Sequence, residues 1–117
     1  MVLTTKIMKR RLGRGEVVWV NLDPTVGGEI KKRRPCLILS KTSTNEQRLT
    51  VVIIPLSSTG TPRLPFIVAL SSISPRTNAR IDQIRAVDKS RIGDVLGTIT
   101  RTEMAAVEEA MRVVLEL

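Results

Sequence analysis

A series of short apolar runs constrains the fold of this chain more than any other feature. Each run has the length of a β-strand and is too short and too rich in branched residues for a helix. The runs are EVVWVNL (16–22), PCLILS (35–40), TVVIIPL (50–56), PFIVAL (65–70) and RIDQIRAVD (80–88). Their spacing suits a small antiparallel barrel or a strongly twisted antiparallel sheet.

The last segment of the chain changes to a helical period. Thr100, followed three residues later by Glu103, forms a capping box, which marks the start of a helix. Apolar residues then recur on one helical face, namely Met104, Val107, Met111, Val114 and Leu115. We expect a mainly β (α+β) fold with a C-terminal amphipathic helix, whose apolar stripe packs in the core or in a dimer interface.

The length of 117 residues allows one compact core, and a hydrophobic share of 42% is typical of a globular protein. We expect a single domain over residues 14–117, preceded by a basic, mobile leader over residues 1–13. No stretch approaches the roughly 18 uninterrupted apolar residues that a membrane span requires. We therefore expect a cytoplasmic protein that makes no membrane contact.

Histidine is absent and Cys36 is the only cysteine, which excludes several kinds of site. An internal disulfide and a Cys/His zinc site are both impossible, and the usual general base at physiological pH is missing. Any chemistry must use Arg, Lys, carboxylates, hydroxyls or a metal held by oxygen. We expect Cys36 to be a small core residue, because a free cysteine with apolar neighbours is usually buried.

The net charge of +8 is unevenly distributed. Residues 103–117 hold four glutamates against one arginine, a net charge of −3, so residues 1–102 carry +11. Such a basic surface suits phosphate recognition or an acidic protein segment. Aromatic residues are only 2% of the chain, so a nucleic acid would be bound by charge and hydrogen bonds rather than by stacking. We expect Trp19 to pack in the core.

The basic segment DPTVGGEIKKRRP (23–35) places four cations side by side between two apolar runs. Neighbouring cations repel by about 1 kcal/mol per close pair in water, so this crowding does not stabilise the fold. It indicates that the segment binds an anionic partner. Arg34 suits a phosphate, because a guanidinium stays charged and donates two parallel hydrogen bonds. Glu29 places a carboxylate nearby. For Lys31 and Lys32, a solvated turn explains the charges equally well.

Two further stretches carry polar residues whose ordinary explanation is structural. PLSSTG (55–60) ends an apolar run in hydroxyls, which are usually turn formers. In ARIDQIR (79–85), strand alternation would place Arg80 and Asp82 on one face, where such a pair is usually a surface ion pair. Neither stretch alone indicates catalysis.

Three separated motifs resemble the MazF/PemK family of toxin endoribonucleases. They are RGEVVWVNLDPTVGGEIKKRRPCLILS (14–40), PLSS (55–58) and DQIRAVDKSRI (82–92). The agreement of three motifs in order makes the resemblance specific. It implies an SH3-like small barrel, a homodimer, and cleavage of single-stranded RNA at short sequences with no metal and no cofactor. It also implies neutralisation by a cognate antitoxin whose acidic, flexible tail covers the RNA groove.

The resemblance assigns roles to individual residues. Arg34 matches the family's catalytic arginine at the scissile phosphate, and Ser57 matches a position, usually threonine, whose hydroxyl touches that phosphate. Glu29 matches an acidic loop residue important in some members. Arg80 and Asp82 match a pair proposed as acid and base in the PemK branch and as base-reading groups elsewhere. The resemblance thus implies catalytic roles for Arg34, Ser57 and Glu29, and RNA binding by Lys31, Lys32, Arg33, Ser58, Arg80, Asp82 and Gln83.

Two other functions compete with RNA cleavage. A toxin of the same fold, like the CcdB poisons of DNA gyrase, would bind a protein and do no chemistry, but those proteins end in a Trp-containing tail that VVLEL lacks. A nonenzymatic nucleic-acid-binding barrel would show an affinity that falls steeply with salt, without cleavage products.

Overall fold

The computed structural model of the chain describes residues 10–117. Within this part, the strands are β1 (Glu16–Asn21), β2 (Arg33–Ile38), β3 (Thr50–Ser57), β4 (Ile67–Ala69), β5 (Asn78–Arg80), β6 (Arg85–Asp88) and β7 (Ile92–Thr98). The α-helices are α2 (Thr42–Gln47) and α3 (Arg101–Leu115), and short 3-10 helices lie at η1 (Ile81–Gln83) and η2 (Lys89–Arg91). None of the described helices is long and apolar enough to span a membrane.

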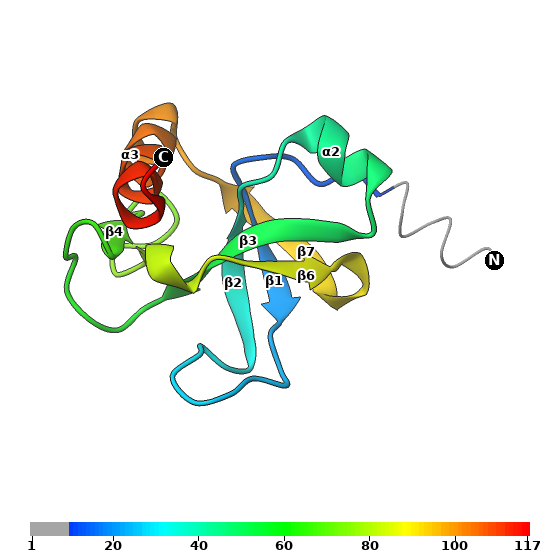
Figure 1. The fold of residues 1–117 in the computed structure, drawn as a ribbon, viewed down its shortest axis with the longest axis horizontal. Coiled ribbons are helices and arrows are strands. Elements are labelled where there is room, and N and C mark those ends of the chain that lie inside the picture. Colours follow the sequence, from blue (N-terminus) through cyan, green and yellow to red (C-terminus); the bar gives the residue numbers. More distant parts are fainter. Residues whose placement is uncertain (1–9) are drawn as a thin grey trace.

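The strands form one antiparallel sheet in the order β4-β5-β3-β2-β1-β7 (Figure 1). β3 is its central strand: one edge pairs with β2, while the other pairs first with β6 and then with β5. Within residues 10–117 the sheet does not close into a complete barrel. The predicted mainly β fold, a curved antiparallel sheet with a C-terminal helix, is confirmed.

Both faces of the central strands are buried, which explains why their sequences are apolar without interruption. Along β3, Val51 and Ile53 point into one core cluster, whereas Ile54 and Leu56 point into another. The second cluster is covered by α3, and the first is enclosed by β1, β2, β3 and β6. Each fully buried aliphatic side chain contributes about 1.5–3 kcal/mol, so these two clusters supply most of the driving force for folding.

Helix α3 begins as predicted. The Thr100 hydroxyl accepts a hydrogen bond from the backbone N–H of Glu103 (3.1 Å), and the Glu103 carboxylate accepts one from the backbone N–H of Thr100 (2.9 Å). Four residues of the predicted stripe, Met104, Val107, Met111 and Val114, contact the core. Leu115 does not contact the core and is 44% exposed.

The predicted strand over residues 80–88 is wrong as a single element. Arg80 ends β5, the chain then turns through η1, and β6 begins at Arg85. Arg80 and Asp82 therefore do not share one strand face. Two elements, β7 and α2, were missing from the prediction: β7 (IGDVLGT) is interrupted by glycines and an aspartate, and α2 (TSTNEQ) has no apolar residue.

The end of the predicted leader is packed on the domain. Residues 1–9 lie outside the described residues. Leu12 is fully buried, and its carbonyl accepts a hydrogen bond from the side-chain amide of the buried Asn45 (2.8 Å). The Arg10 guanidinium donates to the carbonyl of Ile92 (2.7 Å). Residues 10–13 therefore belong to the packed structure rather than to a mobile leader.

Both Cys36 and Trp19 were predicted to lie in the core, but only Cys36 does so. Cys36 is fully buried, as predicted, and burial raises the pKa of its thiol to about 12. Trp19 is only partly buried and lies in neither core cluster, so its predicted core position is wrong. The Arg33 guanidinium covers its ring instead, 4.6 Å from the centroid.

Candidate active-site cleft

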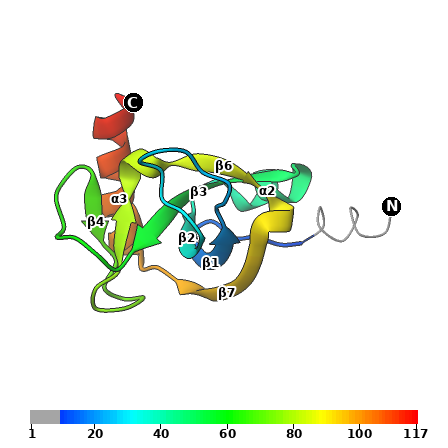
Figure 2. The ribbon, with the colours of Figure 1, turned by 90° about the horizontal axis from the view of Figure 1, so that it is seen from below.

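The loop that joins β1 to β2 (residues 22–32) projects from the sheet on the side away from α2 and α3 (Figure 1). Together with the end of β3 and with η1, it encloses a cleft of about 410 Å³. In Figure 2, which shows the molecule from below, this loop lies toward the viewer and passes in front of β6. The cleft is lined by Gly28, Glu29, Ile30, Lys31, Lys32, Arg34, Ser57, Thr59, Arg80, Asp82 and Gln83.

The strand register brings Arg34 and Ser57 together. β2 and β3 pair so that Cys36 lies opposite Pro55. The same register, continued by two residues, places Arg34 opposite Ser57, and both side chains line the cleft. Residues 23 positions apart in the sequence therefore meet, because β2 begins beside the point where β3 ends.

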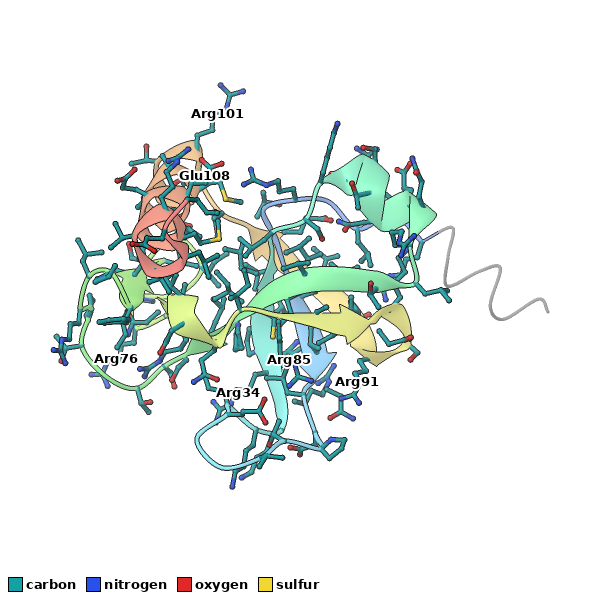
Figure 3. All side chains as sticks on the ribbon, viewed as in Figure 1. Arg34, Arg76, Arg85, Arg91, Arg101 and Glu108 are labelled. Carbon is teal, nitrogen blue, oxygen red and sulfur yellow. The ribbon has the colours of Figure 1, made fainter. Side chains whose placement is uncertain are left out.

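Arg34 is held in place through only one of its nitrogens. Its Nε donates a hydrogen bond to the carbonyl oxygen of Lys31 (2.9 Å). Its two terminal amino groups form no hydrogen bond with the described residues. The guanidinium is thus oriented at the base of the loop (Figure 3), with a free pair of donors that fits a phosphate or a carboxylate.

Ser57 is 8% exposed and works with a second hydroxyl. Its Oγ lies 2.9 Å from the Thr59 Oγ1 and accepts a hydrogen bond from the backbone N–H of Thr59 (3.2 Å). Thr59 was not among the predicted site residues. A hydroxyl two positions after a strand-ending serine is the available signal, because it favours a side-chain turn of this kind.

Glu29 lines the cleft but also closes its own turn. Its Oε1 accepts a hydrogen bond from the backbone N–H of Val26 (2.6 Å). Gly27, between them, has a φ of +56°, in the left-handed region that glycine occupies at little cost. The Glu29 carboxylate is therefore fixed through its Oε1 at the rim of the cleft.

Gln83 connects the loop to η1. Its Oε1 accepts from the backbone N–H of Ile30, and its Nε2 donates to the carbonyl of Gly28, each over 3.4 Å. Under the loop, these residues also line a neighbouring hollow of about 440 Å³ that reaches Arg85. Gln83, predicted to bind RNA, thus positions the loop in this conformation.

Arg80 and Asp82 both line the cleft, yet they do not form a pair. The Arg80 Nη2 donates to the carbonyl of Thr59 (2.7 Å), and its guanidinium lies so close to Gly60 that an added Cβ there would come within 2.9 Å. Among residues 10–117, no ion pair joins Arg80 to Asp82. Arg80 therefore supports the segment after β3, while the Asp82 carboxylate stays exposed to the cleft.

Two predicted site residues lie outside the cleft. Arg33 precedes Arg34 in β2, and because neighbouring strand residues point to opposite faces, it covers Trp19 instead. Ser58 lines a separate hollow that also contains Arg76. The cleft thus contains all three residues predicted to be catalytic, and five of the seven predicted to bind RNA.

The chemistry available in the cleft is that of cations, carboxylates and hydroxyls. Four cationic side chains face two carboxylates, which favours an anionic ligand. The pKa of Cys36 at about 12 leaves its thiol protonated and unreactive. Among residues 10–117, no cluster of three acidic or cysteine side chains could hold a metal ion. The arrangement can bind a phosphodiester and stabilise added negative charge on its phosphorus.

Residues 13–115 match the family described as PemK-like, MazF-like toxins of type II toxin-antitoxin systems. The endoribonuclease MazF9 of Mycobacterium tuberculosis is 30% identical over 89% of this chain and 96% of its own length. The endoribonuclease PemK of Escherichia coli is 36% identical over 82% of this chain and 76% of its own length.

Solved structures agree with these sequence comparisons. MazF from Deinococcus radiodurans superposes with a TM-score of 0.83 at 26% identity, over 92% of this chain and 99% of that one. A mycobacterial endoribonuclease in complex with its cognate antitoxin gives a TM-score of 0.74 at 26% identity, over 92% and 96% of the two chains. The chain therefore belongs to the PemK-like, MazF-like family of type II toxin-antitoxin toxins.

Proposed function

We propose that this protein is the toxin of a type II toxin-antitoxin system and acts as a sequence-selective endoribonuclease that cleaves single-stranded RNA without a metal. One observation carries the proposal: Arg34, with its terminal amino groups free, lies opposite Ser57 in a cation-rich cleft. A phosphodiester seated between them meets a two-pronged donor and a hydroxyl.

The reaction begins when the 2′-hydroxyl of the RNA attacks the adjacent phosphorus. The O2′–P bond forms and the P–O5′ bond breaks, and the departing 5′-oxygen takes up a proton from water, which leaves a 2′,3′-cyclic phosphate and a free 5′-hydroxyl. Arg34 donates to the nonbridging oxygens as charge builds on the pentavalent phosphorus, and Ser57 donates through its hydroxyl. A preorganised donor of this kind contributes about 10²–10³ in rate.

A carboxylate accepts the proton of the 2′-hydroxyl in this mechanism. Among residues 10–117, the carboxylates that line the cleft are Glu29, on the loop, and Asp82, in η1. Glu29 is oriented by Val26, whereas Asp82 projects from η1. Lys31 and Lys32, on the loop, bind the neighbouring phosphates of the RNA, and Arg80 keeps the Thr59 segment in place.

We further propose a cognate antitoxin with an acidic segment, a homodimer, and a cytoplasmic location. The cationic cleft suits an acidic peptide, and the mycobacterial neighbour is an endoribonuclease in complex with its cognate antitoxin. The homodimer is supported by the half-exposed apolar residues Val95 and Leu96 on the edge strand β7. The gyrase-poison alternative is not favoured, because the curated relatives are endoribonucleases.

The test incubates the purified protein with a long single-stranded RNA in EDTA and maps the ends of the products. We expect cleavage with 2′,3′-cyclic phosphate ends, and loss of cleavage in Arg34→Ala. Arg33→Ala is the matched control, because it removes the same charge from the adjacent residue, outside the cleft. Intact RNA, or full activity in Arg34→Ala, would refute the proposal. Inhibited DNA supercoiling with untouched RNA would establish the gyrase alternative.

A further inference from the structure

A second hollow lies beside the cleft, on the side of β4 and β5. We call it the side hollow, and its volume is about 620 Å³, within the range of pockets that hold small ligands. It is lined in part by Ser58, Thr59, Thr61, Arg76 and Asn78. Thr59 lines both the cleft and the side hollow, so the two spaces meet at this residue.

The sheet register fixes how close the side hollow is to the proposed scissile phosphate. Ser57 of β3 pairs directly with Asn78 of β5. Directly opposite residues of antiparallel strands place their side chains on the same face, with Cβ atoms about 4.5–5.5 Å apart. Ser57 lines the cleft and Asn78 lines the side hollow. An RNA strand with its scissile phosphate at Ser57 therefore has the neighbouring nucleotide over Asn78.

The wall of the side hollow carries hydrogen-bonding groups that are held in place. The amide of Asn78, only 4% exposed, is fixed because its Nδ2 donates to the carbonyl of Gly60 (3.1 Å). Its Oδ1 accepts no hydrogen bond from the described residues and remains available to a ligand. The hydroxyls of Thr59 and Thr61 can both donate and accept. An oriented amide and hydroxyls are the groups that read the edge of an unstacked RNA base.

The charge of the side hollow matches a nucleotide rather than a neutral ligand. Arg76 is its one charged lining residue within the described part of the chain, and no carboxylate opposes it there. Arg76 is exposed on a turn closed by a hydrogen bond from the backbone N–H of Thr77 to the carbonyl of Ser74 (3.0 Å). Figure 3 shows it projecting beside β4. Its guanidinium can hold a phosphate that flanks the bound base.

From these observations we propose that the side hollow binds the RNA nucleotide next to the scissile phosphodiester and helps to select the cleavage sequence. Asn78 and Thr61 contact its base, and Arg76 contacts its outer phosphate. This inference rests on the proposed endoribonuclease activity of the cleft, and it assigns part of the sequence selectivity to a separate set of residues.

The first experiment measures RNA affinity without cleavage. A short single-stranded RNA with 2′-O-methyl groups cannot react, and its binding is followed by fluorescence anisotropy over a range of salt concentrations. We expect Arg76→Ala to lower affinity by about threefold to tenfold and to reduce the slope of log affinity against log salt by about 0.7, as for one lost phosphate contact on a single strand. Arg101→Ala is the matched control with unchanged affinity, because Arg101 lies at the start of α3, at the top of the view in Figure 3, and lines neither the cleft nor the side hollow.

The second experiment maps cleavage sites on a long RNA. Thr61→Val keeps the shape of the exposed Thr61 side chain and removes its hydroxyl, so the fold is retained. We expect this variant to change the base preference at one position beside the scissile bond and to leave the other positions as they were.

Three results would overturn the inference. They are an Arg76→Ala variant that matches the wild type in affinity and salt slope, a Thr61→Val variant with an unchanged cleavage profile, and weaker binding of polyglutamate by Arg76→Ala while RNA binding stays the same. The last of these would assign the side hollow to an acidic protein segment. A wild-type protein that cleaves no RNA would refute the proposed activity, while the anisotropy measurement would still decide whether the side hollow binds RNA.

Discussion

Replacing Arg34 by lysine separates the charge of this residue from its geometry. The lysine ammonium keeps the positive charge but is a single point donor, whereas the guanidinium offers two parallel hydrogen bonds to a phosphate. The substitution also removes the Nε hydrogen bond to the carbonyl of Lys31. The structure thus predicts that Arg34→Lys retains RNA binding and loses much of the rate.

The two effects of Arg34→Lys have different magnitudes. The loss of the exposed Nε hydrogen bond costs about 1 kcal/mol of unfolding free energy, or about 4 °C in Tm for a domain of this size. The loss of one preorganised donor to the charged transition state costs about 2.7–4 kcal/mol, a factor of about 10²–10³ in rate. Arg34→Lys should therefore raise the activation free energy of cleavage by much more than it lowers the free energy of unfolding.

The assay is single-turnover cleavage of RNA in EDTA, with the protein in excess over substrate and saturating. Under these conditions the observed rate reports the chemical step rather than RNA binding. Anisotropy with 2′-O-methyl RNA measures binding in parallel, and Arg33→Lys controls for the change of residue type outside the cleft. A rate for Arg34→Lys within tenfold of the wild type would refute the proposal that two parallel hydrogen bonds from Arg34 stabilise the transition state. A loss of affinity equal to the loss of rate would assign Arg34 to ground-state binding.

Two further predictions concern the loop and the helix. Gln83→Ala removes two long hydrogen bonds to the loop, so we expect faster hydrogen exchange at the Ile30 amide, a cleavage rate lowered by about tenfold, and an almost unchanged Tm; unaltered exchange at Ile30 would contradict this positioning role. Burial alone would raise the pKa of the Glu103 carboxyl, but hydrogen bonds from Ser72 and Thr100 together lower it. A lowered pKa in the folded state stabilises the fold at pH values above the ordinary value of 4.5, and this contribution disappears as the pH falls through the folded pKa. Urea unfolding should therefore show that the free energy of unfolding falls more between neutral and acidic pH in the wild type than in Glu103→Gln. Equal decreases in the two proteins would contradict the lowered pKa of Glu103.

Much of the fold follows from local patterns in the sequence. β1, β2, β3 and α3 were predictable because burial on both sheet faces gives unbroken apolar runs, and because the capping box marks where α3 begins. β7 and α2 were not, since neither has an apolar period. α2 depends on Asn45, whose buried amide bonds to Leu12 and Ser40, and contacts between distant segments leave no periodic signal.

The cleft was predictable in its residues but not in its internal contacts. Arg34 and Ser57 were identified through the family's motifs, and the register of β2 on β3 explains why they meet. The role of Gln83 in holding the loop, and the contact of Arg80 with Thr59, depend on how η1 interrupts the predicted strand. The sequence of residues 80–88 predicts one continuous strand and does not indicate the turn at η1.

The separation of Arg33 from Arg34 shows how a small boundary error changes a functional assignment. The predicted strand begins at Pro35, which leaves both arginines in a loop where either can reach a ligand. In the structure β2 begins at Arg33 and pairs it with Asn21 of β1. Strand alternation then applies to both residues, so Arg33 lies over Trp19, a diagonal neighbour on β1, and Arg34 turns to the opposite face.

The same alternation gives the two arginines different energetic roles. Arg33 contributes about 0.5–1 kcal/mol to stability through its cation–π contact with the Trp19 ring, 4.6 Å away. Arg34 contributes a similar amount through its Nε hydrogen bond, but its terminal donors stay free for a phosphate. The two-residue period of a strand therefore turns only one of two adjacent arginines toward the cleft, which is why their alanine variants should differ so sharply in cleavage.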